Sequence, residues 1–415
     1  MTKKRFLKSL DHFGIVLIVA SMLLVFGWTM PTQVKAASGK APDKILFGNP
    51  IALSGMYSAG AMMSQIRAYD LWVEDVNAKG GIYVKEYGKK IPVKIIRYDD
   101  KSDLGTAVKL TEKLILQDKV HFILPPWGTA SHFAIAPVIN KYKTPVIGIT
   151  ASSEKLRELA PKIPYLFILL NQPDEMGQAL VDLCKELGVK SAAVIHHTDL
   201  HGMEFAGKVL PQLAVSGIDV ALYKSYPLGA KDLSPLLKKA KAANVDALLA
   251  FSYPPGTFLI TAQAKAIGLN PKLFYATVGV AFPSYRDKFG ATTVEGIMGA
   301  GVWNPNIPYP GVREWFKRYV KRWGVEPDRW GTAGGYATCE IMQKAIEIAG
   351  SLDPKKIRDI IAREKFDTVL GPVKFENQFN VNYPGHVGQW QNGEFEVVDK
   401  ATRTAKPIYP KPAWQ

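Results

Sequence analysis

Cysteine is scarce in this sequence, with two residues among 415. Two thiols cannot form a disulfide framework for a chain of this length, nor a multi-thiol zinc or iron–sulfur site. The G-x-S-x-G, H-E-x-x-H, P-loop and G-x-G-x-x-G motifs are also absent. Their absence removes the common sequence signatures of serine hydrolases, zinc proteases and nucleotide-binding enzymes.

Blocks of like charge are absent as well, although 52 Lys and Arg against 37 Asp and Glu give a net charge of +15. The basic residues occur singly or in short groups such as Lys238-Lys239, which is typical of a solvated surface. We therefore expect no nucleic-acid partner. The apolar fraction of 47% is typical of a well-packed globular protein.

The longest apolar run lies at 15–28 and is shorter than the roughly 20 residues that a bilayer-spanning helix needs. Basic residues precede it at 3–8, and small residues follow it at Val34-Lys35-Ala36. This order predicts a secretory signal over residues 1–36 that is cleaved after Ala36. We expect the mature protein to be soluble and periplasmic.

Short β-rich runs alternate with helix-period segments along the rest of the chain. The runs at 146–149 and 192–195 are apolar and β-branched, which is typical of strands buried on both faces. The alternation predicts an α/β fold with parallel sheets covered by helices on both faces. About nine such units are too many for one comfortable open sheet, so we expect two sheets in two lobes.

Three small groups of reactive side chains are better explained by structural roles than by metal binding, disulfide formation or catalysis. His196 and His197 are adjacent on a strand end and point to opposite faces, so with His201 they form a poor metal site. Cys184 and Cys339 each lie within a helical segment, and we expect two buried thiols. The S-x-x-K spacing of Ser152 and Lys155 is that of acyl-serine enzymes, but their companion motifs are missing.

The informative positions are three turns in which a strand hands over to a helix. In open α/β sheets, ligands bind beyond the carboxyl ends of the strands. Each turn is made of small or hydroxyl residues and can present free backbone N–H groups that hold a carboxylate without a basic side chain. Aromatic residues beside them suggest an apolar ligand wall. The turns are Ser54-Gly55-Met56-Tyr57, Trp127-Gly128-Thr129-Ala130-Ser131 and Thr150-Ala151-Ser152-Ser153.

The stretch at 48–82 reads GNPIALSGMYSAGAMMSQIRAYDLWVEDVNAKGGI. It contains a strand, a Ser-Gly turn, a glycine before a long helix, and an ending of the form V-x-x-x-N-x-x-G-G-I. It resembles the opening of the leucine/isoleucine/valine-type periplasmic binding proteins of ABC importers. The similarity continues through TPVIGITASSEKL, AAVIHHTDLHGMEFAGKV, VDALLAFSYPPGTFL and EGIMGAGVW.

The resemblance implies the type I periplasmic binding protein fold, in which a three-crossover hinge joins two Rossmann-like lobes and the ligand lies between them. It implies residues 37–171 with 302–376 in the first lobe and 172–301 with 377–415 in the second. Cys184 and Cys339 then lie in different lobes, which argues against a disulfide. The resemblance also implies a monomer that needs no cofactor and no metal.

The resemblance also assigns the ligand site, with carboxylate-binding turns in the first lobe and apolar walls from both lobes. In the second lobe His201 matches an aromatic position and Tyr253 matches a tyrosine. The expected ligand-binding residues are Ser54, Gly55, Tyr57, Trp127, Thr129, Ala130, Ser131, Ala151, Ser152, Ser153, His201, Tyr253 and Val278.

Val278 marks a departure from the family pattern. Members that bind amino acids carry a glutamate there, which pairs with the ligand's ammonium. A buried ammonium without a counter-charge is strongly disfavoured. The ligand therefore either lacks an α-amino group or pairs with another acid, for example Asp199.

These observations predict a non-catalytic solute-binding protein that captures a small amino acid or an apolar or aromatic carboxylate and delivers it to an ABC permease in the inner membrane. One alternative is a sensor of the same fold that signals to a receptor kinase. Another is an exported hydrolase that uses the cleft around Ser152 and Lys155.

Overall fold

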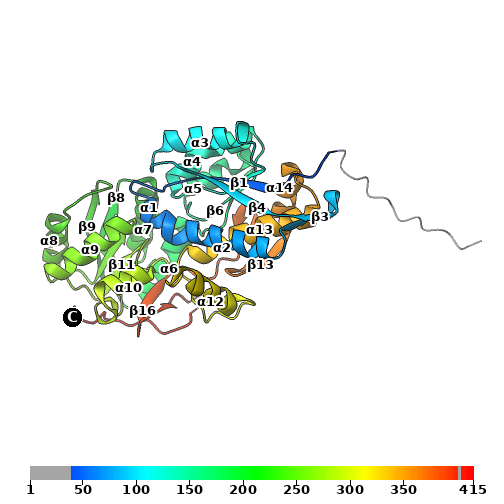
Figure 1. Cartoon of the computed structure of the whole chain (residues 1–415). Coiled ribbons are helices and arrows are strands. Elements are labelled where there is room, and N and C mark those ends of the chain that lie inside the picture. Colours follow the sequence, from blue (N-terminus) through cyan, green and yellow to red (C-terminus); the bar gives the residue numbers. More distant parts are fainter. Residues whose placement is uncertain (1–38, 401–402) are drawn as a thin grey trace, which may run out of the picture. The chain divides into compact units, whose positions relative to one another are not determined.

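The apolar runs form two separate groups of mainly parallel strands in a computed structural model that describes residues 39–400 and 403–415 (Figure 1). The predicted signal at 1–36 lies outside the described residues. Among the helices of the described part, none is both long enough and apolar enough to cross a membrane.

In the first lobe, β1 pairs in parallel with β4 and β5, and β6 pairs in parallel with β7. The strand orders are β4-β1-β5 and β13-β14-β15-β7-β6. The strands are β1 (Ile45–Ile51), β4 (Val93–Asp99), β5 (Phe122–Ile123), β6 (Val146–Gly148), β7 (Leu166–Ile168), β13 (Lys365–Thr368), β14 (Gly371–Glu376) and β15 (Phe379–Asn380), with a separate hairpin of β2 (Ile82–Val84) and β3 (Lys89–Ile91).

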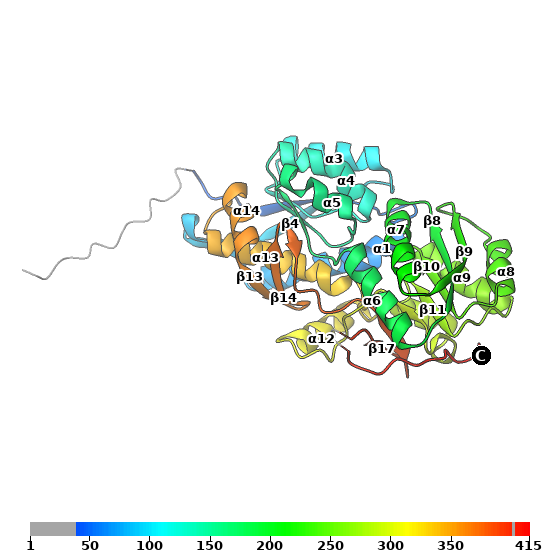
Figure 2. The same cartoon turned by 180° about the vertical axis from the view of Figure 1, so that it is seen from behind.

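Helices cover both sides of the first lobe's strands. One pair of packed helices lies on one side of β1 and β4, and a second pair lies on the other (Figure 1; seen from behind in Figure 2). The first pair is α3 (Leu104–Leu116) with α4 (Thr129–Lys141), and the second is α2 (Arg67–Ala78) with α13 (Thr332–Ala349). The remaining helices of this part are α1 (Ser58–Ala61), α5 (Glu154–Leu159), α12 (Val312–Trp323) and α14 (Pro354–Arg363), with a π-helical turn at Met62–Ile66.

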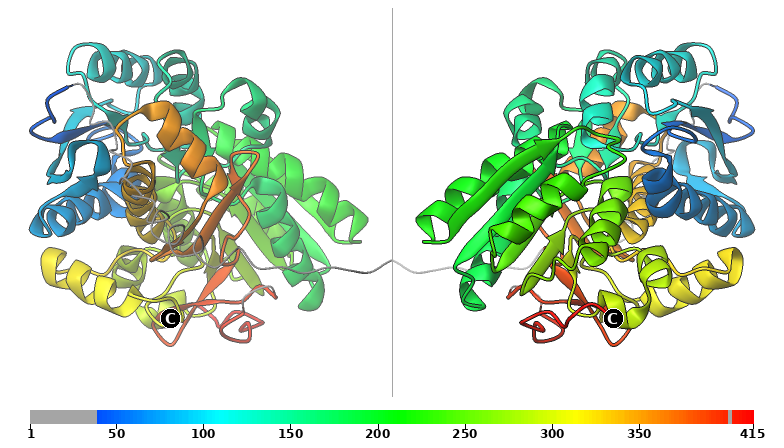
Figure 3. Two further views of the ribbon diagram at one scale, coloured as in Figure 1. Left: turned by 90° about the vertical axis from the view of Figure 1, so that its right-hand side faces the viewer. Right: turned by 90° about the vertical axis from the view of Figure 1, so that its left-hand side faces the viewer.

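The second lobe contains one sheet of order β17-β16-β12-β11-β10-β8-β9. Figure 3 shows the C-terminal strands beside the green strands that precede them in the sequence. The strands are β8 (Ser191–His197), β9 (Asp219–Tyr226), β10 (Ala247–Phe251), β11 (Leu273–Ala276), β12 (Met298–Gly299), β16 (Gly388–Gln391) and β17 (Glu394–Val397). Its helices are α6 (Pro173–Glu186), α7 (Leu200–Val215), α8 (Ser234–Ala242), α9 (Pro254–Ala266), α10 (Pro283–Phe289) and α11 (Ala291–Val294).

The chain crosses between the lobes three times, after β7, after β12 and after β15. Two of these crossings touch, because the side-chain amide of Asn171 donates to the Gly385 carbonyl oxygen at 3.1 Å and lies 2.6 Å from His386 Nδ1. β15 still pairs with β7, so the last crossing follows Asn380. The predicted α/β fold with two lobes and a three-crossover hinge is confirmed.

The sheets also contain antiparallel strands that the strand–helix alternation does not predict. β16 pairs antiparallel with both β12 and β17, and β14 pairs antiparallel with both β13 and β15. β16 and β17 form a hairpin that turns at Asn392-Gly393, where both residues have positive φ. These strands extend the parallel sheets at their edges.

Glu340 on α13 provides a test of the packing beneath the first lobe's strands. Its carboxylate accepts the Val369 N–H at 2.9 Å, and burial raises its pKa from 4.5 to about 7. Because the folded pKa is the higher one, the protonated group's contribution to stability is complete below about pH 4.5 and is lost as the pH rises through 7. Glu340→Gln keeps an acceptor and removes the titration.

We expect Glu340→Gln to have little effect on the free energy of unfolding near pH 5 and to raise it by at most about 3 kcal/mol at pH 8. Urea unfolding at the two pH values measures the difference, and Glu347→Gln, on the exposed face of α13, controls for the charge change. An equal effect at both pH values would show that the Glu340 carboxyl is not desolvated.

Candidate ligand-binding site

Four residues predicted to form the ligand wall meet in one aromatic cluster: Tyr57, Trp127, His201 and Tyr253. Trp127 and Tyr253 have ring centroids 4.9 Å apart, Tyr57 and Trp127 5.4 Å, Tyr57 and Tyr253 5.7 Å, and His201 and Tyr253 5.0 Å. Each side chain is at most 6% exposed. Tyr57 and Trp127 belong to the first lobe and the other two to the second, so the cluster forms where the lobes meet.

The local sequence explains why these side chains converge. Tyr57 and Trp127 follow β1 and β5, while His201 and Tyr253 follow β8 and β10. All four strands pair in parallel with their neighbours. In α/β folds, ligands usually bind in the crevice beyond the carboxyl ends of such strands. The lobes touch there, since α1 contacts α9 and α4 contacts α7 (Figure 1).

Asp199 places a carboxylate against the aromatic cluster. The Tyr57 hydroxyl donates to Oδ2 at 2.8 Å, and the Tyr253 hydroxyl donates to Oδ1 at 3.1 Å. The same Oδ1 accepts the His201 N–H at 3.2 Å, because Asp199 is the N-cap of α7. One carboxylate thus joins a tyrosine of each lobe.

Burial keeps the polar groups of this cluster uncharged. Desolvation and the Asp199 charge raise the pKa of both Tyr57 and Tyr253, so the phenols keep their protons. Desolvation lowers the pKa of His197 to about 4 and also lowers the pKa of His201. Both imidazoles are therefore neutral at pH 7.

The start of α4 presents backbone N–H groups beside the cluster. Its N-cap, Gly128, has φ 93° and ψ 146° and offers no capping side chain. This conformation suits glycine, and a Cβ there would lie 3.6 Å from the Tyr57 ring. The first-turn N–H groups of Thr129, Ala130 and Ser131 need partners from outside the helix. Such a helix start attracts a carboxylate.

The third predicted turn is bonded to its own surroundings. Ser152 N–H donates to Thr129 Oγ1 at 3.2 Å, and its hydroxyl donates to the Asn171 carbonyl at 2.9 Å. The Ser153 hydroxyl donates to Glu204 at 2.6 Å, a bond from the first lobe to the second. Ala151 is fully buried behind them.

Ser54 and Gly55 lie apart from these bonds. Both are exposed, and Ser54 donates to Asp99 through its N–H at 3.1 Å and its hydroxyl at 2.7 Å. Gly55 has φ 81°, and a Cβ there would lie 2.7 Å from the Lys101 carbonyl oxygen. The hydrogen bonds of this turn connect the end of β1 to the end of β4.

Val278 is buried, and its backbone N–H donates to the Ser252 carbonyl at 3.1 Å. Its own carbonyl accepts the Thr257 hydroxyl at 2.6 Å. An apolar side chain thus stands at the end of β11, where the family resemblance places an acid.

Sequence reasoning missed two members of the site's surroundings. Trp330 lies before α13 with its ring 6.3 Å from that of Trp127, and His197 lies at the end of β8 with its ring 4.5 Å from that of Tyr253. His197 could have been found, because it ends a strand whose next turn carries His201. Trp330 follows no strand and carries no comparable signal.

The serine, lysine, histidine and cysteine residues that the sequence analysis considered for other chemistry lie in different surroundings. The Ser152 hydroxyl donates to a backbone carbonyl, whereas Lys155 forms an exposed ion pair with Glu158 at 2.8 Å. His196 stacks on Tyr223, away from His197. In residues 39–400 and 403–415, no three His, Cys, Asp or Glu side chains form a metal-binding group. Cys184 and Cys339 are buried free thiols.

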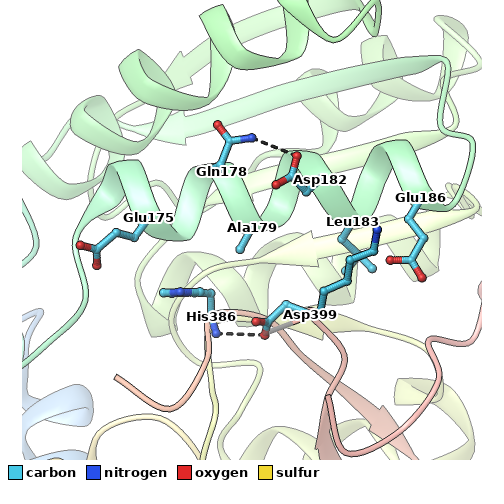
Figure 4. Close-up of a pocket in the computed structure, with 9 residues that line it drawn as sticks. Glu175, Gln178, Ala179, Asp182, Leu183, Glu186, His386 and Asp399 are labelled. Carbon is cyan, nitrogen blue, oxygen red and sulfur yellow. Dashed lines mark hydrogen bonds between the residues drawn. The ribbon is translucent and has the colours of Figure 1, made fainter. Parts of the chain in front are cut away.

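A small cavity adjoins the aromatic cluster, and a larger one lies in the second lobe. The first, of about 20 Å³, is lined by Met56, His197, Tyr226 and Tyr253, and has room for about one water molecule. The other, of about 490 Å³, runs along α6 (Figure 4). It is lined by Glu175, Gln178, Ala179, Asp182, Leu183, Glu186, His386, Asp399 and Lys400, and contains none of the predicted site residues.

Comparison with known proteins identifies the family of this chain. A family model described as periplasmic binding protein matches residues 44–394. The leucine-, isoleucine-, valine-, threonine-, and alanine-binding protein of Pseudomonas aeruginosa is 24% identical over 363 residues, covering 86% of this chain and 88% of that protein.

Solved structures share the fold. The branched-chain amino acid transporter substrate-binding protein of Streptococcus pneumoniae in complex with isoleucine matches with a TM-score of 0.75 and 20% identity, covering 86% of this chain and 99% of that one. A solute-binding protein of an ABC transporter from R. palustris in complex with benzoate matches with a TM-score of 0.73 and 17% identity, covering 89% and 98%. The chain belongs to the periplasmic binding protein family.

Proposed function

We propose that this chain is the substrate-binding protein of an ABC importer and that it captures a small amino acid or an apolar or aromatic carboxylate between its lobes. The observation that carries the proposal is the aromatic cluster, to which both lobes contribute buried rings beside the start of α4. The isoleucine and benzoate of the related structures each combine a carboxylate with an apolar body. The rings of this cluster offer an apolar surface to either body.

In this proposal the first turn of α4 holds the ligand's carboxylate. The N–H groups of Thr129, Ala130 and Ser131 supply donors, and the helix dipole adds a favourable field. The rings of Tyr57, Trp127, His201 and Tyr253 then enclose the apolar body as the lobes close on their hinge. The ligand must prefer the closed form by a few kcal/mol to close it dependably.

The proposal includes the protein's place in the cell. Residues 1–36 act as a signal that is removed after Ala36, and the mature monomer works in the periplasm, where it delivers its ligand to an inner-membrane permease. We move the lobe boundary expected at residue 376 to Asn380, because β15 pairs with β7, so that the lobes comprise 37–171 with 302–380 and 172–301 with 381–415.

A thermal-shift screen of the purified protein tests this function. The panel contains leucine, isoleucine, phenylalanine, benzoate and 4-hydroxybenzoate. A ligand at 100 times its dissociation constant stabilises the folded state by about 2.7 kcal/mol, so we expect at least one compound to raise Tm by several degrees. No shift with any of them, or turnover of the ligand detected by mass spectrometry, would contradict the proposal.

Ala130→Pro then tests whether the ligand's carboxylate binds at the start of α4. Proline removes one N–H group of the first turn and remains compatible with a helix start. α8 already carries Pro235 at the same second position. We expect calorimetry to show binding weakened by about 1.5–3 kcal/mol. Gly105→Pro, at the second position of α3, is the matched control and should leave affinity unchanged.

A further inference from the structure

We infer that Asp199 receives a positively charged nitrogen of the ligand, so that the natural ligand is a zwitterionic amino acid and not a carboxylic acid without an amine. The inference rests on the proposed function and deepens it by choosing between its two ligand classes. It also assigns Asp199 as the residue that determines this choice.

The hydrogen bonds of Asp199 are the first support. Its three donors are the hydroxyls of Tyr57 and Tyr253 and the backbone N–H of His201, and all three are neutral. Among the ion pairs formed within residues 39–400 and 403–415, none includes Asp199. The half-buried Asp199 carboxylate has only neutral donors and solvent to offset its charge, and a ligand ammonium would supply a counter-charge.

The surrounding rings are the second support. The faces of Tyr57, Trp127 and Tyr253 attract cations, and these rings lie within 5.7 Å of one another beside Asp199. The neighbouring His197 and His201 are neutral at pH 7, so neither offsets the Asp199 charge. A ligand that placed only a carboxylate here would face repulsion from Asp199.

The distribution of charge across the cluster is the third support. Tyr57 reaches from Gly128, at the start of α4, to Asp199, at the start of α7. Groups that favour an anion and a group that favours a cation therefore lie one tyrosine side chain apart, which suits the two charges of an amino acid. Asp199 thus provides the counter-charge that Val278 does not.

Paired ligands and one substitution test this assignment. Isothermal titration calorimetry compares leucine with 4-methylpentanoate and phenylalanine with 3-phenylpropanoate, in each case the same carbon skeleton with and without the amine. Asp199→Asn preserves the helix cap, since asparagine is an equally good N-cap, and removes the charge. Asp353→Asn, at the exposed N-cap of α14, is the matched control.

We expect the unmodified protein to bind an amino acid at least 10-fold more tightly than its amine-free partner, because the loss of a charged hydrogen bond weakens binding by about 10- to 100-fold. Asp199→Asn should weaken amino-acid binding by the same factor and leave the amine-free acid unaffected or tighter. Asp353→Asn should change neither.

Equal or tighter binding of the amine-free acids, or unchanged amino-acid affinity in Asp199→Asn, would overturn the inference while the proposed binding function stands. Binding of benzoate or 4-hydroxybenzoate in preference to every amino acid would overturn it in the same way. Failure of all compounds to bind would instead refute the binding function, and the inference with it.

Discussion

Replacing Trp127 by alanine is expected to lower the free energy of unfolding by about 3–5 kcal/mol and to weaken ligand binding more than 10-fold. The indole is 1% exposed, and its Nε1–H donates to Ser64 Oγ at 3.0 Å. Its ring also packs against those of Tyr57, Tyr253 and Trp330. Its removal leaves a cavity where the proposed ligand wall stands.

Urea unfolding and calorimetry with the ligand found in the thermal-shift screen measure the two effects. Trp315→Ala is the matched control, since Trp315 is fully buried among Trp303, Tyr319 and Tyr336, away from the aromatic cluster. It should lose similar stability and keep its affinity. If Trp127→Ala does not fold, Trp127→Phe keeps a ring and tests the affinity. An unaltered dissociation constant in the Trp127 variants would remove this side chain from the site.

Gly202→Ala is expected to destabilise the protein by about 1–3 kcal/mol and to displace the start of α7. A Cβ at Gly202 would lie 2.4 Å from the His197 carbonyl oxygen, which is held in β8 and cannot move away. The helix must therefore lift from the sheet, and it carries Asp199 and His201 with it. We expect ligand affinity to fall together with stability.

Gly207→Ala on the same helix is the control, because a Cβ there meets nothing within 4 Å. Alanine favours a helix interior over glycine by about 0.5–1 kcal/mol, so this variant should be slightly more stable than the unmodified protein and bind normally. The same fall in stability in both variants would show that the close approach of Gly202 to β8 is not what limits this position.

Much of the fold follows from local sequence, and the parts that do not have identifiable reasons. β8 contains a continuous apolar run at 192–195 and β10 consists of one, and their buried parallel pairing is the arrangement such runs favour. β12 has only two residues, Met298–Gly299, so no period can reveal it. The hairpin of β2 and β3 follows Gly80-Gly81, which the sequence indicates only as the end of a helix.

The candidate site also has parts that the sequence predicts and parts that it does not. Tyr57, Trp127, His201 and Tyr253 could be predicted because each follows a strand at the carboxyl edge of a parallel sheet. The bond between Tyr57 and Asp199 joins residues 142 positions apart in different lobes, and no local pattern encodes it. From the sequence alone, the apolar Val278 therefore had two explanations: a ligand without an α-amino group, or an ammonium that pairs with another acid such as Asp199.

The polar groups around the aromatic cluster are bonded to one another, Asp199 with two phenols and Ser153 with Glu204. An incoming molecule can bind only by replacing these internal hydrogen bonds with its own. The measured dissociation constant therefore reflects the difference in free energy between the hydrogen bonds of the empty site and those of the occupied site. A compound that displaces a phenol and offers Asp199 nothing in return leaves an unsatisfied charge behind. Discrimination in this protein then depends less on what a good ligand gains than on what a poor one leaves unpaired.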